Sequence, residues 1–286
     1  MTRFIPYGSA LGLLCLLTLG HVLPGAAQTQ QLGNGAVDWN KLVVRAVGIG
    51  AGNPGAPESA RRALALRAAK MDALRNVLEI VKGVTLTAET TVKNYMTESD
   101  VITSRVTGLV QGAQFGEPRY KEDGSVEMEC TVPMTGAMGD ALLYSQSLQG
   151  AAPPASGWSW TGQQAAPLAT AGPQKYTGLI IDARGLGVHP ALAPKVLGKN
   201  GQELYSSATI TREYALRMGV AGYAKDIDTA KQDSRVAATP LVIKAVDAAG
   251  TNRTDVVIQD ADAAAVQQAN EVTGFLKECR LMILVD

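Results

Sequence analysis

The chain has 286 residues, and its 26 basic and 26 acidic side chains give a formal net charge of zero. Apolar residues make up 46% of the chain, which is enough for the cores of about two domains. The lack of a basic excess argues against a nucleic-acid-binding protein, and an aromatic content of 5% argues against platforms on which bases stack.

Residues 1–27 are predicted to be a signal peptide. Arg3 supplies the positive charge, Ala10–Leu19 is the apolar run, and small residues end at Ala27, where cleavage is expected. The apolar run is too short to remain as a membrane-spanning helix. Leu14 stands before Cys15, where a lipid-attachment motif requires a small residue, so no lipid anchor is expected. We therefore predict a periplasmic protein without a transmembrane span in the mature chain.

Residues 28–40 are polar and Gly-rich and are predicted to form a flexible start. A strand is expected at 42–49. Gly48, Gly50 and Gly52 follow one another at alternate positions, but Pro54 and Pro57 separate them from the next helix. A phosphate-binding loop would lead directly into that helix, so these glycines are interpreted as a flexible connector.

The longest helical pattern runs from Glu58 to Lys82 and ends before Gly83. Two thirds of its helical wheel is apolar, so the helix is expected to lie on a sheet or on a neighbouring helix. The side predicted to be buried holds Ala60, Ala63, Leu64, Met71, Leu74, Leu78 and Val81, and is widened by Leu66, Ala69, Ala73, Val77 and Ile80.

A short strand is expected after this helix at 84–87, then a strand at 109–120 with a bend near Gly112 or Gly116, and a helical segment at 136–148. Asp123-Gly124 favours a hairpin turn. The strict alternation of apolar and polar residues at 126–132 is typical of a half-buried antiparallel strand. Residues 41–148 are therefore predicted to form an α+β domain in which the long helix packs on a curved antiparallel sheet.

Residues 149–174 are rich in Ala, Pro, Gly, Ser and Gln and carry no charge, as expected of a linker. Trp158 and Trp160 lie within it. They either fold the linker back onto a domain or anchor a partner or neighbouring subunit.

Residues 175–286 are predicted to form a second, small α+β domain. Strands are expected at 176–181, 241–247, 255–259 and 280–285, and a helix at 260–276. The last strand is apolar on both faces, which indicates a central position in the sheet. Residues 212–222 are interpreted as a loop.

Few residues suggest a chemical site, and no catalytic set, metal site or cofactor is predicted. Asp182 and Arg184 follow a strand end, where they either form an ion pair that fixes a turn or face a ligand. His189 is the only histidine of the mature chain. Cys130 and Cys279 are either two buried thiols or a disulfide bond.

Arg67 is unusual because it falls in the middle of the apolar side predicted for the long helix. Its aliphatic part could cover apolar surface while the guanidinium reaches water. Alternatively, it pairs with a carboxylate across a subunit contact, a pairing for which the guanidinium is well suited.

The run from Ala60 to Gly83 resembles the signature helix of the LPP-twenty family of bacterial lipoproteins, which includes flagellar assembly protein P and resembles the N-terminal domain of flagellar assembly protein T. The resemblance covers about Val43 to Leu148 and continues through Ser99-Asp100, Gly112-Ala113 and Asp123-Gly124. The missing lipid-attachment motif departs from the family pattern.

The resemblance implies a non-enzymatic envelope protein that acts in assembly or structure, such as an oligomeric ring or disk component at the outer membrane or flagellar motor. Its expected partners are copies of itself or other envelope proteins. The alternative hypothesis is a periplasmic binding module for a small ligand or cell-wall fragment, with its site at the loop of residues 182–189 and the linker tryptophans.

Overall fold

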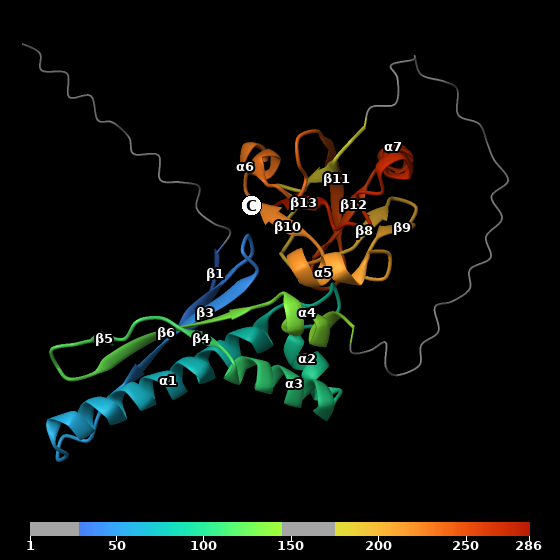
Figure 1. Cartoon of the computed structure of the whole chain (residues 1–286). Coiled ribbons are helices and arrows are strands. Elements are labelled where there is room, and N and C mark those ends of the chain that lie inside the picture. Colours follow the sequence, from blue (N-terminus) through green and yellow to red (C-terminus); the bar gives the residue numbers. More distant parts are fainter. Residues whose placement is uncertain (1–28, 145–174) are drawn as a thin grey trace, which may run out of the picture.

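The structure is a computed structural model and describes residues 29–144 and 175–286 (Figure 1). The predicted signal peptide, the predicted linker, Trp158 and Trp160 lie outside the described residues. The fold is α+β in two parts: a long helix on an antiparallel sheet, followed by a smaller α+β unit, as the sequence predicts.

The first sheet has the strand order β1-β2-β3-β6-β4, and β5 also pairs with β6. Its strongest pairing joins β3 to β6, which are antiparallel along their whole length. The strands are β1 (Thr29–Leu32), β2 (Gly35–Asp38), β3 (Val43–Gly50), β4 (Gln114–Phe115), β5 (Arg119–Tyr120) and β6 (Val126–Pro133).

The predicted flexible start is wrong, because residues 29–38 form the hairpin of β1 and β2. β1 is an edge strand that is largely exposed, so its sequence lacks the alternation that marks a half-buried strand. The hairpin ends at Trp39, whose side chain is fully buried. The polar composition of this segment is therefore the reason why the sequence does not predict these two strands.

The predicted strand at 109–120 is only partly found. Helix α3 (Asp100–Gln111), which follows the short helix α2 (Val92–Thr97), includes its first three residues, and the rest of the segment contains the two short strands β4 and β5. Its β-branched residues favour strands, but α3 buries Ile102, Val106 and Val110 at helical spacing. Residues 84–87 contribute only an isolated bridge between Thr85 and Thr91. Helix α4 (Gly136–Leu143) follows β6.

Helix α1 (Glu58–Gly83) forms where predicted, but only part of the side predicted to be buried is buried. Leu64 and Met71, expected in the core, are 48% and 59% exposed. The side that packs on the sheet is made mostly of small residues at a spacing of about four: Ala65, Ala69, Ala73, Val77 and Ile80.

Gly48 and Gly50 explain why the alanine side of α1 is buried. A Cβ atom at Gly48 would lie 2.1 Å from the backbone nitrogen of Ala73, and one at Gly50 would lie 2.1 Å from the backbone oxygen of Ala65. The glycines therefore allow the backbones of α1 and β3 to approach closely. The interpretation of these glycines as a flexible connector is wrong, since both belong to β3.

Side chains of α1 also complete the edge of β3 beyond the end of β2. The Asn76 side-chain amide donates to the carbonyl oxygen of Val47 at 2.9 Å, and the Ile49 N–H donates to the Asp72 carboxylate at 3.0 Å. These bonds satisfy backbone groups that a neighbouring strand would otherwise pair. Asp72 and Asn76 thus fix the position of α1 along β3.

The second sheet is mixed and has the order β10-β13-β7-β11-β12-β8-β9. β13 lies between β10 and β7, which confirms the predicted central position of the last strand. The strands are β7 (Gly178–Asp182), β8 (Val196–Gly198), β9 (Glu203–Tyr205), β10 (Gly222–Ala224), β11 (Pro240–Ala249), β12 (Asp255–Ile258) and β13 (Leu281–Leu284).

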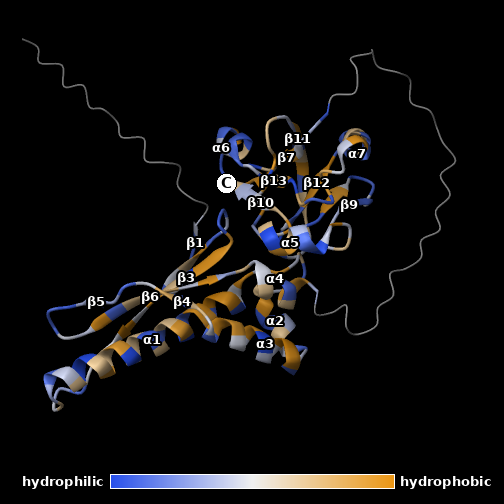
Figure 2. Cartoon of the chain, in the orientation of Figure 1, coloured by the Kyte–Doolittle hydropathy of each residue, from blue (hydrophilic) through white to orange (hydrophobic). Residues whose placement is uncertain are grey.

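Three helices accompany this sheet: α5 (Arg212–Met218), α6 (Ile227–Gln232) and α7 (Asp260–Thr273). The prediction of a loop at 212–222 is wrong in its first half, where α5 forms. α7 forms where a helix was predicted and ends at Gly274, whose left-handed backbone is typical of a helix end. Hydrophobic residues concentrate on the strands of this unit (Figure 2).

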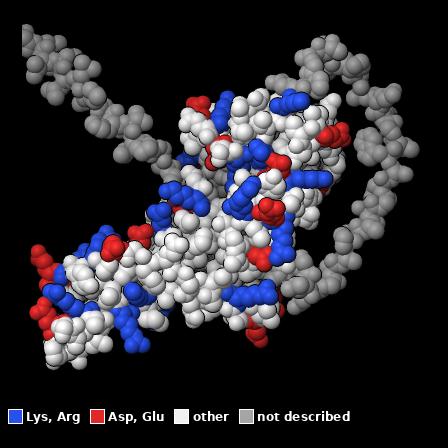
Figure 3. All heavy atoms as spheres, in the orientation of Figure 1, with Lys and Arg blue, Asp and Glu red and all other residues white. Residues whose placement is uncertain are grey.

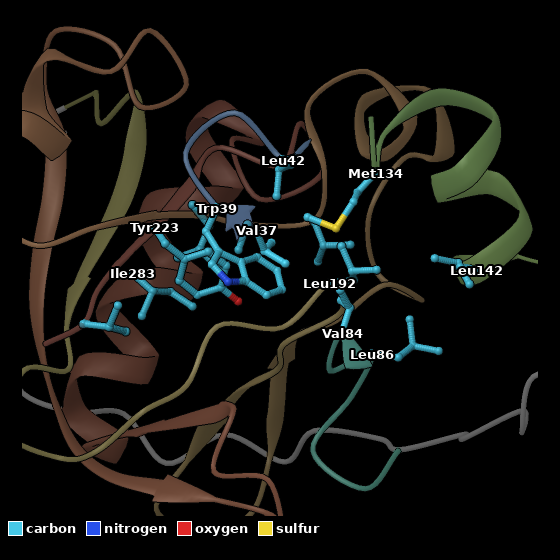
Figure 4. Packing of buried hydrophobic residues seen from close by; sticks show 14 of the residues in the cluster. Val37, Trp39, Leu42, Val84, Leu86, Met134, Leu142, Leu192, Tyr223 and Ile283 are labelled. Atoms are coloured by element: carbon cyan, nitrogen blue, oxygen red, sulfur yellow. The ribbon is translucent and has the colours of Figure 1, made fainter. Parts of the chain in front are cut away.

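The two halves share one hydrophobic core (Figure 4). Trp39 meets Tyr223 edge to face, with ring centroids 5.7 Å apart. Residues 85–88 accept hydrogen bonds from the second half, from the N–H groups of Leu192, Ala193 and Asn252 at 2.8–3.1 Å. These contacts hold the N-terminal and C-terminal halves together as one body.

Among the residues described in the two ranges, no helix has the length and apolar character needed to cross a bilayer.

Candidate functional site

The outer side of α1 carries a second apolar stripe, opposite the side that packs on the sheet. Its residues are spaced alternately by four and three, the heptad spacing with which helices pack against one another. We call the exposed part of it the outer stripe: Ala60, Leu64, Arg67 and Met71.

The stripe continues beyond Met71, and there it is covered. Leu74 and Leu78 are half-buried and pack against the main core, and α1 contacts both α2 and α3. The cover ends before the N-terminal half of α1, which projects away from the second unit (Figure 1). The outer stripe therefore consists of helix-packing positions that remain exposed to solvent in the described residues.

Arg67 lies within the outer stripe and is exposed. Among the described residues, its guanidinium makes no hydrogen bond, ion pair or ring contact. The expectation that Arg67 lies between buried apolar residues is wrong, because its neighbours Ala63 and Met71 are exposed too. The guanidinium is free to pair with a carboxylate of another molecule.

Basic residues flank the outer stripe: Arg61 and Lys70 beside it, and Arg75 one turn further on. The acidic residues of α1 are already engaged. Glu58 pairs with Arg62 at 2.7 Å, Glu79 pairs with Lys82 at 2.8 Å, and Asp72 binds the edge of β3. Lys and Arg side chains are scattered over the part of the surface that covers α1 (Figure 3). The outer stripe is therefore an apolar surface flanked by basic side chains.

Asp182 is the last residue of β7 and Arg184 lies in the loop that follows, and the two side chains pair with each other. Two hydrogen bonds of 2.7 and 2.8 Å join the guanidinium to the carboxylate. These bonds lower the pKa of Asp182 and raise that of Arg184. The Gly185 N–H donates to Asp286 at 2.9 Å, which joins the loop to the strand end of β13. This geometry favours the turn-fixing role over a ligand site.

A buried polar cluster lies beneath α5 and was not anticipated from the sequence. Arg235 is 7% exposed and donates to the carbonyl oxygens of Met218, Gly219 and Cys279. Burial lowers the pKa of Arg235 and raises the pKa of Cys279 to about 11. Tyr205 donates to the carbonyl oxygen of Val220. The cluster joins α5 to the segment before β13, and it is closed to solvent.

Cys130 and Cys279 are both free and buried. Burial raises the pKa of Cys130 to about 11 as well, so both thiols are protonated at neutral pH. Within the two described ranges, no three His, Cys, Asp or Glu side chains come together in a way that could hold a metal ion.

Of the candidate interaction residues that the structure describes, Arg67 lies on the outer stripe, whereas Asp182 and Arg184 belong to a different surface. Sequence reasoning assigned Leu64 and Met71 to the core and so missed them as surface residues. One signal in the sequence could have identified them. Apolar residues at an alternating spacing of four and three form a second stripe on a helix whose alanines form a separate apolar side.

Residues 178–286 match the family model described as Treponema pallidum Tp0624, second domain. This range lies inside the predicted C-terminal domain of residues 175–286 and does not include α1. A search of curated proteins gave no match.

Proposed function

We propose that this chain is a non-enzymatic, exported envelope protein that acts in assembly or structure by binding another protein through the outer stripe of α1. The observation that carries the proposal is the exposure of Leu64 and Met71 at helix-packing positions on a helix that is otherwise fixed to its sheet. Burying such residues against a partner gains apolar area without rearranging the fold.

The anchoring of α1 supports this role. Its alanine side is held against Gly48 and Gly50, and Asp72 and Asn76 bond to the edge of β3. A rigid helix presents its outer side chains in a fixed arrangement, which lowers the entropy lost on binding. The proposed location is the periplasm, in a ring or disk at the outer membrane or flagellar motor.

The alternative proposal, a periplasmic binding module at the loop of residues 182–189, has weaker support. A ligand at Asp182 or Arg184 would have to replace a two-point pairing that already satisfies both groups.

Photo-crosslinking in the cells that naturally make the protein tests the proposal. A photoreactive amino acid at Met71 is expected to give a protein adduct of defined mass, because this side chain faces the partner. Arg105, on the exposed side of α3, is the matched control position and is expected to give none. Absence of an adduct from both Leu64 and Met71 would contradict the proposal.

A further inference from the structure

We infer that the partner of the outer stripe is a second copy of this chain, which binds through the exposed side of its helix α7. The inference rests on the proposed function and names the surface that the outer stripe contacts. It is carried by the spacing of exposed residues on the two helices, by their charges, and by the positions of the two helices in the molecule.

The exposed side of α7 has the same heptad spacing as the outer stripe. Ala261, Ala265, Gln268 and Val272 are all exposed and are separated by four, three and four residues. We call them the α7 stripe. Val272 is 48% exposed, the same fraction as Leu64. Both stripes span twelve residues, which corresponds to about 17 Å along a helix axis.

The side-chain sizes of the two stripes are complementary, with small residues on α7 and larger ones on α1. Leu64 and Met71 project from α1, whereas Ala261 and Ala265 leave shallow positions on α7. Helices pack by inserting side chains of one into spaces between those of the other.

The charges at the flanking positions are opposite. Asp262 and Glu271 flank the α7 stripe, and α7 contains no Lys or Arg. Arg61 and Lys70 flank the outer stripe at the corresponding positions, and Arg75 extends this basic side one turn beyond Met71. Since all charges are basic on one side and acidic on the other, either relative direction of the helices pairs opposite charges. Arg67 would then find the carboxylate it lacks within its own chain.

Other surfaces of a second copy fit less well. A second outer stripe would place Arg61, Arg67 and Arg75 against like charges, which is unfavourable. Among the described helices, α4 is the other one with an acidic residue and no basic residue. Its Asp140 already pairs with Arg212 at 2.9 Å, where α4 packs against α5. α7 is therefore the acidic helix that remains available.

The two stripes cannot meet within one chain, because α1 and α7 lie at opposite ends of the molecule (Figure 1). Each copy thus offers one basic and one acidic surface, and each contact leaves one surface of each copy unused. Such head-to-tail contacts generate a chain of copies, or a ring where the rotation closes. A contact over three helical turns buries less than the usual interface area of about 1,600 Å². The association should therefore be weak and depend strongly on concentration.

Charge reversal in two separate variants tests this inference on the mature chain, residues 28–286. The first variant carries Arg67→Glu and Arg75→Glu, and the second carries Asp262→Lys and Glu271→Lys. Sedimentation velocity over a concentration series should show the mass of the wild-type chain rising, while each variant alone stays monomeric. An equimolar mixture of the two variants should regain the association, because every contact in it again pairs opposite charges.

The controls separate folding from binding. All four residues lie at the surface, so each variant should melt within about 2 °C of the wild type, and Arg105→Glu should associate like the wild type. Asp262 lies in the first turn of α7, where a positive charge is unfavourable. If Asp262→Lys lowers the melting temperature, Glu271→Lys alone takes its place.

The outcomes distinguish this inference from the proposed function. The inference is overturned if the variant with Asp262→Lys and Glu271→Lys associates as strongly as the wild type, or if the equimolar mixture does not associate. If the wild type remains monomeric while Met71 crosslinks to a different protein, the inference fails and the proposed function stands. Binding of the monomer to phosphatidylglycerol vesicles, lost in the Arg67→Glu and Arg75→Glu variant, would identify a lipid surface and overturn the inference.

Discussion

Replacing Gly48 with alanine is expected to lower the free energy of unfolding by about 3 kcal/mol, at the upper end of the cost of overpacking a core. The new Cβ atom would lie 2.1 Å from the backbone nitrogen of Ala73 and 2.3 Å from the backbone oxygen of Ala69. These are backbone atoms, so no rotamer change can relieve the contact. α1 would have to move away from β3.

Urea denaturation followed by circular dichroism measures this effect, and Gly83→Ala is the matched control. A Cβ atom at Gly83, in the last turn of α1, has no atom within 4 Å, so alanine there should leave the free energy of unfolding unchanged or raise it slightly. Equal unfolding midpoints for Gly48→Ala and the wild type would show that α1 and β3 are not in close backbone contact.

Replacing Arg235 with methionine is expected to cost about 3 kcal/mol, because methionine retains the apolar packing but leaves buried carbonyl groups without donors. The guanidinium donates to Gly219 and Cys279 at 3.2 and 3.0 Å, and also to Met218. The substitution also removes the desolvation cost of a buried positive charge, and this offsets part of the lost stability.

The same denaturation experiment on Arg105→Met provides the comparison, since Arg105 is an exposed arginine in α3. That variant should unfold within about 0.5 kcal/mol of the wild type, as is usual for surface substitutions. If Arg235→Met were equally mild, the buried cluster beneath α5 would not hold the second unit together.

The sequence predicts the long helix, the alternating strand at residues 126–132 and the central last strand, because each has a strong local pattern. It predicts a buried side of α1 that is too wide, because it also includes Leu64 and Met71, which are exposed. Leucine and methionine carry more hydrophobic signal than alanine, but the decisive fact is the pair of glycines on β3, which only a close backbone approach explains. That information lies in a different segment of the chain from α1.

The candidate surface is predicted only in part, for a related reason. Arg67 is conspicuous within an apolar stripe, and its exposure follows once the alanine side is known to face the sheet. Leu64 and Met71 look like core residues in sequence, since nothing local shows that the cover provided by α2 and α3 ends before they are reached. The extent of a neighbouring element is a tertiary property.

Thiol labelling of Met71→Cys tests most directly the central claim, that α1 is fixed by its alanine side and leaves its heptad-spaced side exposed. The wild-type chain of residues 28–286 has only the buried Cys130 and Cys279, whose raised pKa values make them unreactive at neutral pH. At a concentration low enough to prevent association, Met71→Cys should gain one thiol per chain that reacts as fast as a free cysteine. Labelling as slow as that of the two wild-type thiols would mean that this side of α1 is buried, and would contradict the claim.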